Sequence, residues 1–176
     1  MSFVWLEKYI RSTPDFPKEG VIFRWYGSLF RDPLAVKKVL NAFYERYKKM
    51  KVDAVLGLES RGFIFGALLA YKLELPFLLM RKKGKLPPPT LSVEFDHEYS
   101  HEAFEIEEGI LKEGENILVI DDIMATGASF EAAAILIERA NAEIVEFGCL
   151  IELERLKGRE LLKRPVFSLY KINHQA

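Results

Sequence analysis

The chain has 176 residues, of which 49% are hydrophobic and 29% are charged, a composition typical of a globular domain with a substantial core. Its formal net charge is −1 and its sequence pI is about 6.3, so there is no overall basic excess that would favour nucleic acid or an anionic membrane. The single cysteine, Cys149, excludes a disulfide within the chain, and its apolar surroundings predict a small buried side chain. No segment has the pattern of a signal peptide or a membrane span, so we expect a cytoplasmic protein.

The first elements are predicted from capping residues and apolar spacing. Residues 3–11 have the spacing of a short amphipathic helix, and Ser12–Gly20, with two prolines and a terminal glycine, is expected to be a loop. The segment Pro33–Met50 predicts a surface helix, because Asp32 can cap it, proline suits its first position and apolar residues recur every three or four positions.

Two strand–loop–helix–strand units follow. In the first, the strand Asp53–Leu58 leads through "ESRG" into the helix "FIFGALLAYKL" and the strand Pro76–Met80. In the second, the strand Asn116–Ile120 leads through "DDIMATGAS" into the helix "FEAAAILIERA" and the strand "EIVEFGCLI", and a last strand "VFSLYKI" follows. Nearly continuous apolar strands that alternate with helices indicate an α/β fold with a parallel sheet covered on both faces.

The segment between the two units has the period of a β-strand. Leu91, Val93 and Phe95 alternate with polar residues, and Phe104 and Ile106 alternate with glutamates on the return. We therefore expect an antiparallel pair of strands with its tip near residues 97–102.

The turn after "ILVI" carries the strongest chemical signal. Two carboxylates stand at the carboxyl end of a predicted parallel strand, where open α/β sheets bind ligands. Small residues follow, which let backbone N–H groups and the positive end of the next helix approach a phosphate. Carboxylates suited to vicinal hydroxyls, followed by a phosphate cradle, predict a ribose 5-phosphate site; the alternative is an ordinary turn with a Ser or Thr helix cap. The candidate residues are Asp121, Asp122, Ala125, Thr126, Gly127, Ala128 and Ser129.

This turn resembles the phosphoribosyl-diphosphate motif of type I phosphoribosyltransferases, except that Ala128 stands where a second glycine is frequent. The stretches "PDFPKEGVIFR", "GLESRGFIFG", "RKKGKLP", "EYSHEAFEI" and "LKGRELL" also occur in the order and spacing of adenine phosphoribosyltransferases. The resemblance covers nearly the whole chain.

The resemblance implies one domain over residues 1–176 with a Rossmann-like central parallel sheet flanked by helices. A small hood at about residues 1–32 and a flexible antiparallel loop at about residues 92–107 would complete this type I phosphoribosyltransferase fold. It also implies transfer of ribose 5-phosphate from phosphoribosyl diphosphate to N9 of adenine, with release of diphosphate. Mg²⁺ would be held by the diphosphate and the ribose hydroxyls without a dedicated protein ligand. The protein would be a homodimer with small-molecule substrates and no nucleic-acid or membrane partner.

An anion site is expected where "LESRG" ends a strand and opens a helix, because N–H groups and a guanidinium are available there. By resemblance, this loop holds the diphosphate. The family often has a cis peptide bond at the position of Glu59–Ser60, and Glu59 stands where aspartate is common. The alternative for Arg61 is a surface salt bridge. In "RKKGK", four cations in five residues suit a diphosphate better than a solvated run, and by resemblance Arg81 reaches the neighbouring subunit's diphosphate. The candidates are Glu59, Ser60, Arg61, Gly62, Arg81, Lys82 and Lys85.

The purine pocket is expected in "GVIFR". By resemblance, backbone groups of Ile22 and Arg24 pair with adenine, Phe23 stacks on it and Ile123 lies against it. The family usually continues "FRDI", whereas this chain has "FRWY", so Trp25 replaces an acid. This departure leaves open another purine, such as hypoxanthine, as the acceptor.

The stretch "HEYSH" has the form of the zinc-protease motif H-E-x-x-H. That interpretation requires His97 and His101 on one face of a helix, yet the preceding residues have strand periodicity. By resemblance, Glu98 is instead the carboxylate that handles the purine's proton and Tyr99 is the aromatic beside it, and with Arg61 they form the candidate catalytic set. The alternative for Glu98 is one more solvated acid, because seven of the fifteen residues from 94 to 108 are Asp or Glu.

Two other functional classes remain as alternatives. One is a non-catalytic regulator that binds phosphoribosyl diphosphate, which the balanced charge and the retained Glu98 disfavour. The other is a zinc hydrolase.

Overall fold

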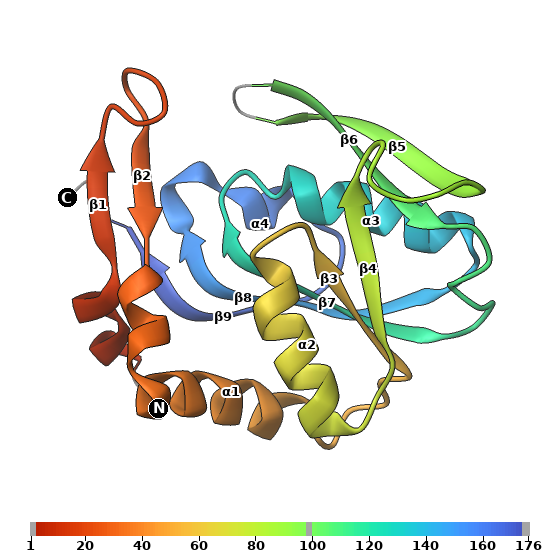
Figure 1. The fold of residues 1–176 in the computed structure, drawn as a ribbon, viewed down its shortest axis with the longest axis horizontal. Helices are drawn as coiled ribbons and strands as arrows, with labels where there is room; N and C mark the ends of the chain where they lie inside the picture. Colours follow the sequence, from red (N-terminus) through yellow and green to blue (C-terminus); the bar gives the residue numbers. More distant parts are fainter. Residues whose placement is uncertain (1–2, 98–99, 174–176) are drawn as a thin grey trace.

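A seven-stranded sheet forms the centre of the protein. The structure, a computed structural model, describes residues 3–97 and 100–173. The strand order is β5-β6-β4-β3-β7-β8-β9, and all neighbours from β4 to β9 run parallel, while β6 runs antiparallel to β4 and to β5 (Figure 1). The predicted α/β fold with a central parallel sheet is thereby confirmed. The strands are β3 (Ala54–Leu58), β4 (Phe77–Lys82), β5 (Thr90–His97), β6 (Ser100–Glu107), β7 (Asn116–Met124), β8 (Glu143–Leu153) and β9 (Val166–Ile172).

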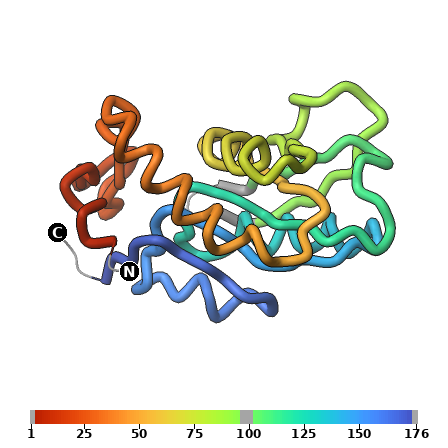
Figure 2. Tube along the Cα trace, turned by 90° about the horizontal axis from the view of Figure 1, so that it is seen from below, coloured from red at the N-terminus to blue at the C-terminus, as the bar shows by residue number. Residues whose placement is uncertain are grey.

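Helices cover both faces of the sheet, as the apolar strands require. Helix α2 (Gly62–Leu73) packs on one face, against the side of β7 that presents Leu118 and Ile120 (Figure 2). Helix α3 (Ala128–Arg139) packs on the opposite face, where alternate residues of β7 such as Val119 contribute to a second apolar cluster. Within the described residues, no helix is long and apolar enough to cross a bilayer.

Helix α1 (Pro33–Tyr47) begins as its sequence predicts. The Asp32 side chain accepts hydrogen bonds from the backbone N–H groups of Leu34 and Ala35, at 3.0 and 3.1 Å. These bonds satisfy two of the donors that the first helical turn leaves unpaired. The helix ends three residues before the predicted Met50.

The N-terminal segment, for which a hood is predicted, has a small sheet of its own and is called the hood below. Its 3₁₀ helices η1 (Val4–Tyr9) and η2 (Gly27–Arg31) flank a two-stranded antiparallel sheet of β1 (Arg11–Pro14) and β2 (Ile22–Trp25). The prediction of a loop from Ser12 to Gly20 was therefore wrong at its start. Residues Arg11–Pro14 pair with β2, a partner that the local sequence does not show. Proline is tolerated at the end of such an edge strand.

Strand β7 is longer than predicted. It continues to Met124, so Asp121 and Asp122 belong to the strand and not to the following loop. Ladder pairing with the long strand β8 extends it, as Asp121 lies opposite Cys149. Cys149 is fully buried, as expected.

Strands β5 and β6 form the predicted antiparallel hairpin. Asp96 pairs with His101 and His97 with Ser100 across the two strands. These backbone positions are extended, so they cannot form the helix that the zinc-protease motif requires. Among the residues the structure describes, no group of three or more His, Cys, Asp or Glu side chains is arranged to hold a metal ion.

We expect Asp32→Ala to lower the midpoint of thermal unfolding by a few degrees, because α1 loses its cap and the Tyr9 hydroxyl loses its acceptor at 2.5 Å. Asp32→Asn is the control, since asparagine also caps helices, and it should retain most of the stability. The Tyr9 hydrogen bond, followed by that from Ala35, lowers the pKa of Asp32 below its ordinary 3.8. The charged cap therefore stabilises the folded protein above about pH 4. The stability that Asp32→Ala loses relative to the parent protein should become smaller as pH falls below that value. A deficit that is unchanged at pH 3 would contradict this account.

Candidate active site

The candidate site lies at the point where the strand order reverses. From β3 the chain crosses to β4 on one side, and it later returns to β7 on the other side of β3. The loops after β3 and β7 therefore diverge from neighbouring strands, which is where open α/β sheets bind ligands. Figure 1 shows that the β1–β2 and β5–β6 hairpins both rise on this side of the sheet, toward which β4 points.

The loop after β7 surrounds a hollow suited to a phosphate. Asp121 and the residues from 123 to 130 line it, which include the candidates predicted after the two acids. Gly127 has a φ of 84°, a left-handed conformation that favours glycine, and α3 begins directly after it. Gly127, the N-cap residue, has no side chain to cap this helix, and the Ala128 N–H donates only a long hydrogen bond, of 3.5 Å, to Thr126 Oγ1. The first residues of α3 line the hollow, so the positive end of the helix is available to an anion there.

The loop is supported from behind by the short helix α4 (Gly158–Leu161). A Cβ atom on Gly127 would lie 2.5 Å from the Gly158 carbonyl oxygen, and a Cβ on Gly158 would lie 2.7 Å from the Gly127 nitrogen. The two backbones are therefore in direct contact, and both positions require glycine. The stretch "LKGRELL" thus acts on the site through its backbone.

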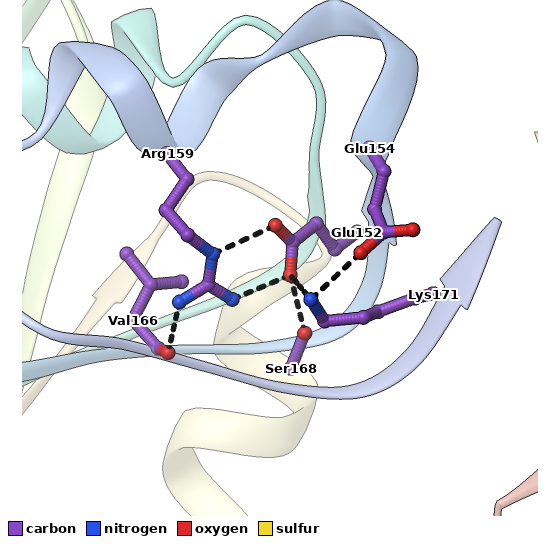
Figure 3. A network of polar contacts seen from close by, with 6 residues as sticks. All are labelled: Glu152, Glu154, Arg159, Val166, Ser168 and Lys171. Carbon is purple, nitrogen blue, oxygen red and sulfur yellow. Dashed lines mark hydrogen bonds and ion pairs between the residues drawn. The ribbon is translucent and has the colours of Figure 1, made fainter. Parts of the chain in front are cut away.

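A buried carboxylate anchors α4 to the sheet (Figure 3). Glu152, at the end of β8, accepts two hydrogen bonds from Arg159 at 2.9 and 2.6 Å and one from Ser168 at 2.5 Å. Arg159 also donates to the Val166 carbonyl oxygen at 2.6 Å, and Lys171 lies 3.7 Å from Glu152. Burial opposes ionisation of Glu152, but the Arg159 and Ser168 hydrogen bonds outweigh it and lower its pKa. This network fixes the helix that carries Gly158.

The loop after β3 approaches β7 closely. The peptide bond Glu59–Ser60 is cis, as expected. A Cβ on Gly62 would lie 2.7 Å from the Ile120 carbonyl oxygen, so only glycine allows the start of α2 to reach this position. Glu59 turns toward β4, where it accepts hydrogen bonds from Arg81 at 3.2 Å and from the Lys82 backbone at 2.7 Å.

Arg61 and Tyr26 meet at the carboxylate of Asp122. Arg61 Nε and the Tyr26 hydroxyl donate to the same oxygen, Asp122 Oδ2, at 2.5 and 2.7 Å. Asp122 and Tyr26 are 3% and 1% exposed, so this contact is shielded from water. Burial, followed by the charge of Asp122, raises the pKa of Tyr26, so its hydroxyl stays protonated and donates. The carboxylate predicted for the ribose is thus joined to the arginine predicted for the diphosphate.

Asp121 lies beside this group and accepts a hydrogen bond from the Asp122 backbone N–H at 2.8 Å. Burial, followed by the neighbouring Asp122 charge, raises the pKa of Asp121 well above its ordinary 3.8. A ligand that donates hydroxyl hydrogen bonds would offset this cost.

The predicted purine residues lie in the hood, on β2. The Phe23 ring is nearly parallel to that of Trp25, with 6.3 Å between centroids, and packs edge to face on Phe16 at 5.1 Å. Arg61 lies 5.9 Å from the Phe23 ring, so the hood adjoins the loop after β3. Arg24 is buried and donates to the Ser12 hydroxyl. Ile22 lies on β2 with them, whereas Ile123 lines the hollow after β7.

The basic run ends β4 and faces the β5–β6 hairpin. Lys82 forms an ion pair with Glu102 at 2.9 Å and Lys83 pairs with Glu94 at 3.4 Å. The backbone N–H of Lys85 donates to Glu105 at 2.7 Å. The predicted catalytic residues Glu98 and Tyr99 lie outside the described residues.

Comparison with known proteins decides the family. A model of the phosphoribosyl transferase domain matches residues 26–176. The adenine phosphoribosyltransferase of Desulfosudis oleivorans is 44% identical over 158 residues, which are 90% of this chain and 91% of that protein. The chain belongs to the adenine phosphoribosyltransferase family. Among solved structures, the Saccharomyces cerevisiae adenine phosphoribosyltransferase complexed with adenine and an imino-altritol bisphosphate has a TM-score of 0.88, 39% identity and coverage of 94% of this chain and 97% of that one. The Giardia lamblia APRTase complexed with 9-deazaadenine has a TM-score of 0.92, 34% identity and 99% coverage of each chain.

Sequence reasoning missed two contributors to this family site. The sequence shows Tyr26 only as the last residue of "FRWY", which departs from "FRDI", and its contact with Asp122 spans 96 positions of the chain. Gly158 stands within "LKGRELL", which resembles the family. A glycine before the charged residues of "GRE" was the one local sign of a close backbone approach.

We expect Asp121→Asn to raise the midpoint of thermal unfolding by a few degrees at pH 7.5 without ligand. The raised pKa means that the folded protein retains a proton that the unfolded chain loses above about pH 4, so stability falls as pH rises from there. The increase in the unfolding midpoint of Asp121→Asn should therefore become smaller as pH falls toward 4. Asp53→Asn is the matched control, because the side-chain and backbone hydrogen bonds of Asn116 lower the pKa of Asp53, and its effect should have the opposite sign. A less stable Asp121→Asn protein at pH 7.5 would contradict this assignment.

Proposed function

We propose that this chain transfers the 5-phosphoribosyl group from phosphoribosyl diphosphate to N9 of adenine and releases diphosphate, a reaction of purine salvage. One observation carries the proposal. The phosphate hollow after β7 and the Arg61 loop after β3 lie on adjacent strands, with the Asp122 carboxylate bonded to Arg61 between them. A sugar that bears a 5-phosphate at one end and a diphosphate at C1′ has this sequence of groups.

Each part of the donor has a matching part in the site. The N-terminal end of α3 and the backbone of residues 125–129 would hold the 5-phosphate, with hydroxyl donors from Thr126 and Ser129. Asp121 and Asp122 would accept hydrogen bonds from the ribose hydroxyls. Arg61 and the N–H groups at Ser60 and Gly62 would hold the diphosphate.

The basic end of β4 supports the diphosphate assignment. The Nε atom of Arg81 is buried and has no hydrogen-bond partner among the described residues. A buried unpaired donor is costly, and an anionic oxygen would satisfy it. Lys82 and Lys85 would add positive charge as the leaving group departs.

The purine would lie against Phe23 of the hood, with hydrogen bonds to backbone groups of Ile22 and Arg24. Within the described sheets, β2 pairs only with β1, so its second edge is not covered by a strand. Glu98 would accept the purine's proton as N9 attacks C1′, which gains oxocarbenium character as diphosphate leaves. Closure of the β5–β6 hairpin, with Tyr99, would exclude the water that otherwise hydrolyses the sugar.

Mg²⁺ fits this site through the substrate. The Asp122 carboxylate is already compensated by Arg61 and Tyr26, and the described residues contain no cluster of three metal-binding side chains. Diphosphate oxygens and ribose hydroxyls are the oxygen ligands that Mg²⁺ prefers. When bound, the ion would neutralise charge on the leaving diphosphate.

We also propose a cytoplasmic homodimer. Ile64, Leu68 and Tyr71 of α2 are 40%, 37% and 85% exposed, and Leu79 of β4 is 42% exposed. Arg81 follows Leu79 by two positions on the same strand face, so a partner that covers Leu79 would lie beside Arg81. This placement supports the expectation that Arg81 reaches the neighbouring subunit's diphosphate.

The purine assignment is tested by supplying phosphoribosyl diphosphate and Mg²⁺ with adenine, hypoxanthine or guanine in separate reactions. We expect AMP and stoichiometric diphosphate with adenine. The kcat/KM should be at least about tenfold lower with the other bases, because a site that pairs with adenine's 6-amino group rejects bases that have an oxygen at this position. A preference for hypoxanthine would make the base assignment wrong, and no turnover with any base would favour the regulator.

The two carboxylate roles are separated by Glu98→Ala and Asp122→Ala. Loss of the proton acceptor should lower kcat by about 10²–10⁴-fold with nearly unchanged affinity for phosphoribosyl diphosphate. Asp122→Ala should instead weaken the affinity for that donor, as measured by calorimetry. The reverse pattern would show that the roles are exchanged.

A further inference from the structure

Tyr26 joins the hood's aromatic cluster directly to the carboxylate of Asp122 near the end of β7. Its ring is 1% exposed and packs on Phe30 at 5.8 Å and on Phe65 at 6.1 Å between centroids. These contacts leave the hydroxyl little freedom and direct it at Asp122 Oδ2, 2.7 Å away. The family's usual "FRDI" has no hydroxyl at this position.

Asp122 needs the Tyr26 hydroxyl because Arg61, its other donor, is also expected to bind the diphosphate. The Arg61 side chain is 38% exposed and pairs with Asp122 at 2.5 Å, yet it is also the guanidinium that the diphosphate would attract. When the guanidinium shifts toward a diphosphate, a carboxylate that is 5% exposed at its side chain would lose its principal donor. Burial of an unsatisfied charged acceptor is costly, and the torsion that orients a carboxylate is soft.

We propose that Tyr26 is a positioning residue that holds the Asp122 carboxylate in its ribose-binding orientation while Arg61 engages the diphosphate. A neutral phenol suits this role, because it donates to the carboxylate and carries no positive charge for which the diphosphate would compete. Burial and the Asp122 charge keep the phenol protonated. The inference rests on the proposed assignment of the ribose hydroxyls to Asp122.

The test is Tyr26→Phe, which removes the hydroxyl and retains the buried ring. The dissociation constant of ribose 5-phosphate is measured by calorimetry with and without saturating diphosphate, together with kcat and KM for phosphoribosyl diphosphate. We expect the ribose 5-phosphate dissociation constant measured with diphosphate, and the KM, to rise about tenfold, as for loss of a hydrogen bond to a charged group. Without diphosphate the dissociation constant should change by less than about twofold, because Arg61 still donates to Asp122.

Tyr9→Phe is the matched control. It removes another hydroxyl of the hood that donates to a carboxylate, Asp32, at 2.5 Å, but at the start of α1. Both dissociation constants should stay within about twofold of the parent values. Phe30→Leu loosens the ring cluster around Tyr26 without removing a hydrogen bond, so it should lower the thermal midpoint and leave the ratio of the two dissociation constants unchanged.

A double-mutant cycle completes the test. If Tyr26 acts through Asp122, Tyr26→Phe in an Asp122→Asn background should add less than about a twofold loss of ribose 5-phosphate affinity. The proposal is overturned by additive losses, by equal losses of ribose 5-phosphate affinity with and without diphosphate, or by an unchanged ribose 5-phosphate affinity of Tyr26→Phe with diphosphate present. A Phe30→Leu protein whose affinity depends on diphosphate in the same way as that of Tyr26→Phe would also overturn it. If Asp122→Asn alone leaves ribose 5-phosphate affinity intact, the ribose assignment of Asp122 fails, and the Tyr26 proposal fails with it.

Discussion

The Asp122 carboxylate joins the parts of the chain that surround the proposed site. It lies on the central strand β7, and its Oδ2 atom accepts hydrogen bonds from Arg61 of the loop after β3 and from Tyr26 of the hood. A carboxylate so well shielded from water is stable as an anion only if donors surround it. The position of the hood over the sheet and the position of Arg61 are therefore linked through one buried charge.

The phosphate hollow depends on backbone contacts more than on side chains. Gly127 and Gly158 bring two segments within van der Waals distance, and the Glu152–Arg159 network holds the second segment against β8 and β9. On the other side, Gly62 lets α2 begin against Ile120. Preorganised N–H groups can bind an anion without reordering the loop, so the rigid surroundings are part of the proposed binding site.

The predictions that succeeded concern segments with a strong local pattern. The apolar run of β3 and the alternation of Leu91, Val93 and Phe95 define strands by their period, and Asp32 followed by proline defines a helix start. The prediction of a loop at Ser12–Gly20 was wrong at its start because β1 is stabilised by pairing with β2. The predicted end of β7 was wrong because pairing with β8 extends the strand past the two acids. In both places a non-local partner outweighs the turn residues of the local sequence.

The sequence by itself determined the family, because carboxylates, small residues and a helix start follow one another within a few positions from Asp121 to Ser129. It also favoured extended chain over a helix before His97, since alternation is a local property. The predicted tip at residues 97–102 was wrong in its bounds, because the two strands pair as far as His97 and Ser100. Only the tertiary structure decided that Tyr26 donates to Asp122, that Gly158 supports Gly127 and that Lys82 pairs with Glu102. These contacts form between segments that folding brings together, and a hydrogen bond across such a distance leaves no period or spacing in the sequence of either partner.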